Sequence, residues 1–236
     1  MLPGAQMLFG SGRRLPYDAE VEYLESTGTQ WIDTGLVNFQ VGTSYDFLFD
    51  LKFNQRPSSN YIGIGFTSGL QQAFIAYNSN TASNIYMAFA NNITNTIASN
   101  LANDTNRHVA ECNCVNGNLK YSFDGVEVLT KTGVAGFVIN KFALFAMSTP
   151  ATIFNVGFFG RIYRAKFTNN GTDVFDYIPV RFTNEQGVSE GAIFDRANPT
   201  VGMNPDGSPR TDGIYRNRGT GAFVIGPDKA RFGLTS

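Results

Sequence analysis

The sequence predicts an all-β protein in which two antiparallel sheets pack as a sandwich. Aromatic residues make up 14% of the 236 residues, and together with 25 glycines they match the composition of strands and tight turns. Residues 45–53, YDFLFDLKF, alternate apolar and polar side chains, as in a strand with one buried face. Asn116-Gly117 and Asp124-Gly125 separate short apolar runs and are strong signals for two-residue hairpins. No stretch shows a capped helical stripe.

The first 16 residues differ from the rest of the chain. They mix apolar residues with glycine and proline, and neither a period of 2 nor one of 3.6 holds among them. We therefore predict an extended N-terminal arm over residues 1–16 and one β-domain over residues 17–236. An arm of this composition is either disordered or becomes ordered on a partner. The candidate partner-binding residues are its large apolar and basic side chains, Leu2, Met7, Leu8, Phe9, Arg13 and Arg14.

The predicted strands after the arm succeed one another with short turns. Beyond residues 45–53, they lie at 61–66, 73–77, 85–90, 107–131 (a three-stranded meander), 142–147, 160–167, 174–182 and, as a short strand pair, within 214–228. Residues 198–213, NPTVGMNPDGSPRTDG, form a turn-rich loop that is longer than ordinary connections. Such a loop indicates either a functional or a mobile segment.

Charge and cysteine content argue against several classes of protein. Charged residues are 16% of the chain and the net charge is −1, which disfavours a nucleic-acid surface and polybasic membrane attachment. The apolar runs are too short to cross a membrane, and no signal peptide is evident, so we expect a soluble chain that does not use the standard secretion route. Cys112 and Cys114 fall on the same face of a strand, and we expect them to be reduced thiols.

Residues 23–35, YLESTGTQWIDTG, closely resemble the opening of laminin-G-like, concanavalin-A-like jelly-roll domains of bacteriophage structural proteins and bacterial surface proteins. The close of the chain resembles the same group in GRIYRAKFTNNGTDVFDYIPVRF (160–182), GAIFDRA (191–197) and IYRNRGTGAFVIGPD (214–228). The resemblance covers nearly all of residues 20–228. It implies a two-sheet antiparallel jelly roll, whose first two strand segments bend at Ser26-Thr27-Gly28.

Catalysis is not expected from the acidic residues near this opening. Jelly rolls of this shape include glycoside hydrolases that carry three acids on one strand, and the chain offers Glu20, Glu22 and Glu25. Glu25 would need a bulge to share a face with the other two, and the central residue is Glu rather than Asp. Trp31, the only tryptophan, is interpreted as a core residue rather than a platform for stacking a sugar.

Other polar residues likewise favour structural roles. His108 is the only histidine, has no nucleophile near it in the sequence, and is interpreted as a surface or strand-end residue. We expect no metal and no cofactor. The scattered acids match no calcium loop and are interpreted as turn formers and solvated strand residues: Asp104, Asp173, Asp176, Asp206 and Asp212. Three arginines near the end of the chain are interpreted as rim charges: Arg210, Arg216 and Arg218.

The resemblance leads to two functional hypotheses. The first is a non-enzymatic virion structural protein of a bacteriophage, on the head or the tail. It would be made in the host cytoplasm and attached by its arm to capsid or tail subunits, as a homo-oligomer or in many copies. Contact with host surface polysaccharide is left open, and neither nucleic acid nor membrane insertion is expected. The second hypothesis is a carbohydrate-binding module at a bacterial surface, for which the sequence specifies no glycan-binding residue.

Overall fold

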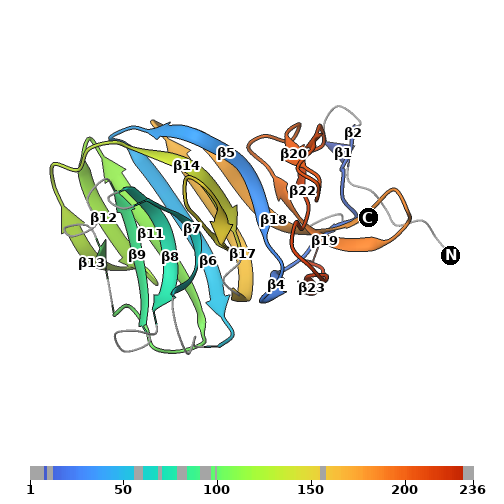
Figure 1. Ribbon diagram of the computed structural model, residues 1–236, viewed down its shortest axis with the longest axis horizontal. Coiled ribbons are helices and arrows are strands. Elements are labelled where there is room, and N and C mark those ends of the chain that lie inside the picture. The colour runs from blue at the N-terminus through green and yellow to red at the C-terminus, as the bar shows by residue number, and fades with distance from the viewer. Residues whose placement is uncertain are drawn as a thin grey trace.

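The computed structural model describes residues 8–9, 13–55, 61–68, 71–78, 84–90, 97–98, 100–154 and 158–230. The protein is all-β, and none of the residues in these ranges is helical (Figure 1). These ranges accordingly hold no helix long and apolar enough to cross a membrane.

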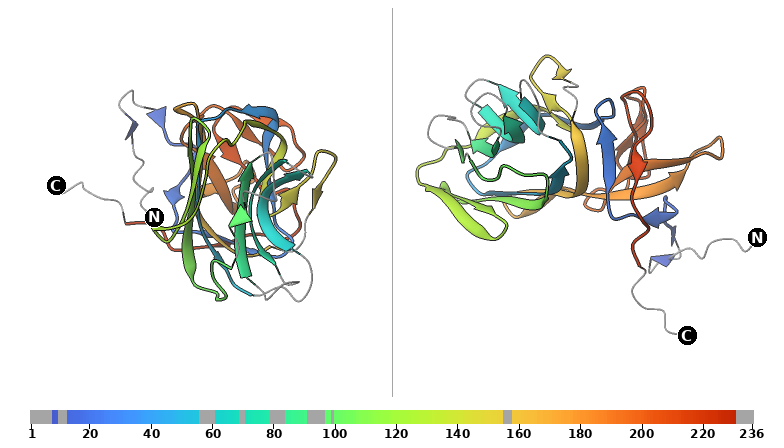
Figure 2. Two further views of the ribbon diagram at one scale, coloured as in Figure 1. Left: turned by 90° about the vertical axis from the view of Figure 1, so that its left-hand side faces the viewer. Right: turned by 90° about the horizontal axis from the view of Figure 1, so that it is seen from below.

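One large sheet runs the length of the molecule. Its spatial order is β13 (Val126–Lys131), β12 (Asn118–Phe123), β11 (Arg107–Val115), β6 (Tyr45–Phe53), β17 (Phe159–Asn169), β18 (Thr172–Thr183), β19 (Ser189–Asp195), β22 (Ile214–Tyr215), β20 (Gly202–Met203) and β21 (Pro209–Arg210). Three more strands join it from the side, β3 (Ala19–Glu20) on β18, β4 (Leu24–Thr27) on β17, and β23 (Val224–Ile225) on β4. The meander β11–β13 stands at one end of the molecule, and β19–β23 stand at the other (Figures 1 and 2).

Three smaller sheets complete the described fold. The first has the order β10 (Ile97–Ala98), β9 (Asn84–Ala90), β8 (Gln71–Asn78), β7 (Tyr61–Ser68), β15 (Met147–Ser148) and β16 (Ile153–Phe154). The second pairs β5 (Ile32–Val41) with β14 (Phe137–Leu144), and the third pairs β1 (Leu8–Phe9) with β2 (Arg13–Arg14). The predicted strands at 61–66, 73–77, 85–90, 160–167 and 174–182 all lie within these observed strands.

Strand β6 provides the centre of the core. Alternate residues from Tyr45 to Phe53 are buried, which confirms the predicted alternation. The Phe47 ring stacks on Phe167 of β17 at 4.1 Å between centroids and on Phe89 of β9 at 4.7 Å. Because β17 belongs to the large sheet and β9 to the sheet of β7–β10, these stacked rings show that the two sheets pack face to face.

Two tyrosine hydroxyls bridge the same two sheets. Tyr45 of β6 and Tyr121 of β12 each donate to the carbonyl oxygen of Phe89 at 3.1 Å, and the Phe89 N–H donates to the Tyr121 hydroxyl at 2.5 Å. Backbone groups of a buried strand need partners, and here side chains of the facing sheet supply them. Burial raises the pKa of the Tyr121 hydroxyl well above its ordinary value, so it stays protonated and able to donate.

The predicted hairpin turns are confirmed by their backbone angles. Asn116 and Gly117 have φ of 50° and 77°, and Asp124 and Gly125 have φ of 51° and 77°. Both central residues of a type I′ turn require positive φ, which Asn, Asp and Gly adopt at the lowest cost. The turn predicted around Asn169-Asn170-Gly171 behaves in the same way, with φ of 50° and 76° at its last two residues.

The opening stretch bends where the resemblance implies. Gly28 has φ of 105°, and a Cβ at this position would come within 2.5 Å of the Phe159 ring, so both backbone angle and space require glycine. The Gln30 side chain holds the bend, because its Oε1 accepts from the Thr27 N–H at 2.8 Å and its Nε2 donates to the Ala222 carbonyl at 3.1 Å. The first strand segments are therefore tied to the last part of the chain.

Three predictions about strands need correction. The strand predicted at 142–147 is interrupted at Phe145, whose φ of 59° ends β14 and separates it from β15. The strands at 214–228 do not pair with each other, since β22 joins β19 and β23 joins β4. The 198–213 loop contains regular structure, because β20 and β21 form a short antiparallel pair within it.

Buried apolar residues form a second, smaller core cluster on β18, β19 and β22. Its members are Ile178, Val180, Phe182, Ala192, Phe194 and Ile214. Tyr17 packs against this cluster, with its ring 5.0 Å from that of Phe194. In the main core, Cys112 and Cys114 are buried free cysteines of β11, and burial raises the pKa of both thiols.

Candidate functional site

The structure describes only part of the arm that the sequence proposes for partner binding. Leu2 and Met7 lie outside the described residues. Leu8 and Phe9 form β1 and pair antiparallel with Arg14 and Arg13 of β2, and only their backbone is described. This short pair stands at the same end of the molecule as β19–β23 (Figures 1 and 2). The arm thus contains two short strands that its irregular sequence pattern did not predict.

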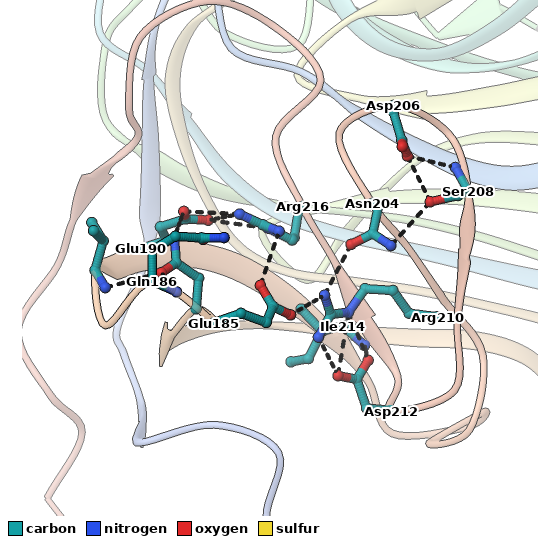
Figure 3. Close-up of polar contacts among 12 residues, drawn as sticks. Glu185, Gln186, Glu190, Asn204, Asp206, Ser208, Arg210, Asp212, Ile214 and Arg216 are labelled. Carbon is teal, nitrogen blue, oxygen red and sulfur yellow. Dashed lines mark hydrogen bonds and ion pairs between the residues drawn. The ribbon is translucent and has the colours of Figure 1, made fainter.

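At that end of the molecule, an ion cluster lies over Phe182, the last large side chain of β18. We call it the Phe182 cluster, and its members are Phe182, Glu185, Glu190, Arg210, Asp212 and Arg216. Figure 3 shows the polar contacts among its charged residues. The guanidinium carbons of Arg210 and Arg216 lie 5.7 and 5.5 Å from the centre of the Phe182 ring. Cations over an aromatic face at these distances are attracted by the ring's quadrupole.

Local turns bring these charges together. The Asn184 Oδ1 accepts from the amides of Gln186 at 3.0 Å and Val188 at 2.9 Å, which closes the turn between β18 and β19. The Asp206 Oδ1 accepts from the Ser208 amide at 2.8 Å and closes the turn between β20 and β21 (Figure 3). Glu185 lies in the first turn and Arg210 follows the second, so the two hairpins present opposite charges to each other.

The arginines of the cluster are held by carboxylates of this chain. Arg210 donates to Asp212 at 2.6 Å and to Glu185 at 3.1 Å, and Arg216 donates to both Glu190 oxygens at 2.9 Å. The Asp212 carboxylate raises the pKa of Arg210, against the opposing effect of burial. Both arginine side chains are 14% exposed, so they are half-buried and paired with carboxylates rather than the rim charges that the sequence indicates.

The ion pairs of the Phe182 cluster have a structural role. Arg210 holds Asp212, and Arg216 holds Glu190, through more than one hydrogen bond. A single bond from Arg210 to Glu185 at 3.1 Å links the β20–β21 hairpin to the β18–β19 turn. The neighbouring Ser208 hydroxyl donates to Asp206 at 2.6 Å, but no histidine, cysteine or lysine stands among the cluster residues to activate it. Glu185 is 60% exposed and presents the only largely solvated charge of the cluster. The arrangement therefore orders the 198–213 segment and offers no nucleophile.

Trp31 lies beside this region and packs against the main core. It is half-buried, and the Arg218 guanidinium lies 5.4 Å from the centre of its rings. Arg218 in turn donates to Asp33 at 2.7 Å, which fixes the cation over the indole. This placement agrees with the interpretation of Trp31 as a core residue, and it shows that Arg218, like Arg210 and Arg216, is engaged by a carboxylate.

The three acids near the start do not converge. Glu20 lies in β3 and accepts from the Tyr17 hydroxyl at 3.2 Å, whereas Glu25 lies in β4 and accepts from Arg161 at 2.5 Å. β3 and β4 pair with different strands, and Glu22 is an exposed residue between them. A hydrolase needs two carboxyl groups that face one glycosidic bond.

We therefore expect no hydrolysis of any member of a polysaccharide panel, as measured by release of reducing ends. Glu22→Gln serves as the test variant and Glu127→Gln, which changes another exposed acid, as its matched control. Turnover that Glu22→Gln abolishes and Glu127→Gln preserves would overturn this expectation.

The structure confirms one part of the interpretation of His108 and contradicts the interpretation of Asp176. His108 is a strand-end residue of β11, as interpreted, but it is not a surface residue, because its side chain is only 8% exposed and lies between Asp104 and Asp124. Asp176 is 7% exposed and pairs with both Arg164 and Arg196, so it does not lie on a solvated strand face. Asp104 is only four residues before His108, whereas Asp124, and the Arg164 and Arg196 partners of Asp176, are 12 to 20 residues away and are brought close by strand pairing.

The remaining acids act as expected where their contacts are described. Asp104 and Asp206 accept from nearby backbone amides in turns, Asp173 pairs with Lys166 across neighbouring strands, and Asp212 belongs to the Phe182 cluster. Within the described part of the chain, no three residues of the His, Cys, Asp and Glu types are arranged to hold a metal ion.

No model of a known protein family matches the chain, and no curated protein is significantly similar to it. The all-β architecture is thus the part of the family resemblance that the findings support.

Proposed function

We propose that the protein is a non-enzymatic structural protein of a bacteriophage particle, with a jelly-roll domain displayed outward and attached by its N-terminal arm. The observation that carries the proposal is the placement of the strands. The arm strands β1 and β2 stand at one end of the molecule, and the β11–β13 meander stands at the other (Figure 1). Attachment through the arm would therefore present the meander end away from the particle.

The jelly-roll assignment rests on the packing of the sheets and on the resemblance at both ends of the chain. Phe47, Phe89 and Phe167 connect two facing sheets of mostly antiparallel strands. Strand β6 lies between β11 and β17, neither of which comes next to it in the sequence, so the sheet is built by long crossovers as in Greek-key sandwiches.

The local chemistry supports a structural rather than a catalytic role. The polar residues of the Phe182 cluster satisfy one another, and the three N-terminal acids are apart. The partners in this proposal are capsid or tail subunits, and the protein is present in many copies or as a homo-oligomer. Its location is the virion, after synthesis in the host cytoplasm.

The test compares particle binding with glycan binding. The full chain is incubated with purified particles of the phage that encodes it, stripped of this protein, and sedimented; the same preparation is applied to an array of bacterial surface glycans. We expect saturable co-sedimentation and no requirement for a glycan. Binding to defined glycans without binding to particles would favour a carbohydrate-binding module and contradict the proposal.

A further inference from the structure

The only histidine of the chain is enclosed by two carboxylates at the end of β11. Its Nδ1 lies 2.7 Å from Asp124 Oδ2, and its Nε2 lies 2.8 Å from Asp104 Oδ1. The ring stacks on Phe123 at 4.8 Å between centroids, and the side chain is 8% exposed. A neutral imidazole has one N–H and one lone pair, so it donates to one carboxylate only. The imidazolium donates to both, and the two contacts are satisfied together only in the charged form.

The same two carboxylates also fix the backbone on either side of the ring. Asp104 Oδ1 accepts from the Asn106 amide at 2.8 Å, within the segment that leads into β11. Asp124 Oδ1 accepts from the Val109 amide at 2.9 Å, and Asp124 is the first of the two positive-φ residues of the β12–β13 turn. The imidazolium therefore links segment 100–106, through Asp104, to the β12–β13 turn, through Asp124.

Segment 100–106 also contacts the facing sheet. The Leu101 amide donates to the Ile85 carbonyl of β9 at 3.0 Å, and the Ile85 amide donates to the Ala102 carbonyl at 2.9 Å. One end of the segment is thus bound to the sheet of β7–β10, and the other end is bound through Asp104 and His108 to the large sheet. We propose that Asp104, His108 and Asp124 form a pH-sensitive latch, closed while the imidazole is protonated, that holds segment 100–106 against the β12–β13 turn.

The charges around the ring determine the direction of its response. Burial lowers the pKa of His108, but the hydrogen bonds and charges of Asp124 and Asp104 outweigh burial and leave the pKa raised. The residue opposite on β6 is Leu51, and β12 contributes the uncharged Phe123. The nearest charged residues lie on the other face of the sheet, because side chains alternate along each strand; they are Arg107 on β11 and Asp50 and Lys52 on β6. On that face, Arg107 pairs with Asp50 at 2.6 Å.

The pH window of the latch is set by these directions. A raised pKa in the closed state means that the histidine's contribution is complete below the ordinary histidine pKa of about 6.5 and is lost as the pH rises through the raised value. At the acidic side, the Asn106 amide and His108 lower the pKa of Asp104, so Asp104 stays ionised to below the ordinary aspartate range. The latch is closed between these two limits and opens as the pH rises above the upper one, the raised pKa of His108. It does not depend on the proposed function.

Two measurements on the full chain test this proposal together. Because the chain has one histidine, its imidazole carbon-bound protons give a single NMR titration curve. Amide hydrogen exchange then reports opening at Asn106 and Val109, whose N–H groups bind the latch carboxylates. We expect a His108 pKa above about 6.5. We also expect the protection of both amides against exchange to fall as the pH rises through the pKa of His108. The fall should be about tenfold for each unit by which this pKa exceeds the ordinary histidine pKa.

The controls separate the latch from general effects of pH. The Ala197 amide donates to the Asp195 carboxylate at 3.0 Å without a histidine, and its protection should not follow the same transition. In His108→Gln, protection at Asn106 and Val109 should be independent of pH over this range, and Asp104→Asn should lower the His108 pKa. A His108 pKa at or below about 6.5, protection that does not change with pH, or the same change in His108→Gln would overturn the proposal. The wild-type titration alone decides the first of these even if a variant fails to fold.

Discussion

Phe47→Ala is expected to lower the free energy of unfolding by about 3–5 kcal/mol, the range for removing a large aromatic ring from a packed core. Phe47 is 2% exposed and stacks simultaneously on Phe167 of its own sheet and Phe89 of the facing sheet. Removal of the Phe47 ring leaves a cavity that does not close, because Phe167 is fixed in β17 and Phe89 is fixed in β9. Denaturant unfolding followed by circular dichroism measures the effect.

Val126→Ala is the matched control, since Val126 is 63% exposed at the start of β13. A surface change of this kind should alter the free energy of unfolding by no more than about 0.5 kcal/mol. Equal small effects of Phe47→Ala and Val126→Ala would mean that the two sheets do not share an aromatic core centred on Phe47.

Sequence alone predicted those parts of the fold that local physics determines. Strand β6 is predicted by a period of 2, and the turns at Asn116-Gly117 and Asp124-Gly125 by the positive φ that these residue types tolerate. The break at Phe145 was not predicted, because an aromatic residue with φ of 59° is held there by its surroundings rather than by its own preference. Tertiary contacts overrode the local pattern at that point.

The polar sites show the same division. Arg210 and Asp212 are two residues apart, and their pairing is the part of the Phe182 cluster that sequence spacing offers. Glu185 and Glu190 reach the arginines only because β18, β19 and β22 are neighbours in the sheet. His108 was interpreted from its isolation in the sequence, yet Asp124 reaches it across the β11–β12 pairing. A single sequence shows which charges exist but not which strands bring them together.

Removal of residues 1–16 is expected to abolish attachment to the particle while leaving the domain folded. Tyr17 packs on Phe194, and the Asp18 amide donates to the Arg181 carbonyl at 2.8 Å, so a chain that begins at Tyr17 keeps the first contacts with the second core cluster. The change in unfolding free energy should not exceed about 0.5 kcal/mol. Each large apolar side chain of the arm that is buried on a partner contributes about 1.5–3 kcal/mol before the costs of ordering.

The measurement that tests the central claim most directly is co-sedimentation of three proteins with purified particles: the full chain, the variant that begins at Tyr17, and the full chain carrying Leu8→Ser and Phe9→Ser. Thermal melting of each protein serves as the control for folding. The account predicts three equal melting curves, saturable binding of the full chain, and loss of binding by both variants. Normal binding of the variant that begins at Tyr17 would contradict the account, because the contact with the particle would then lie on the β-domain itself.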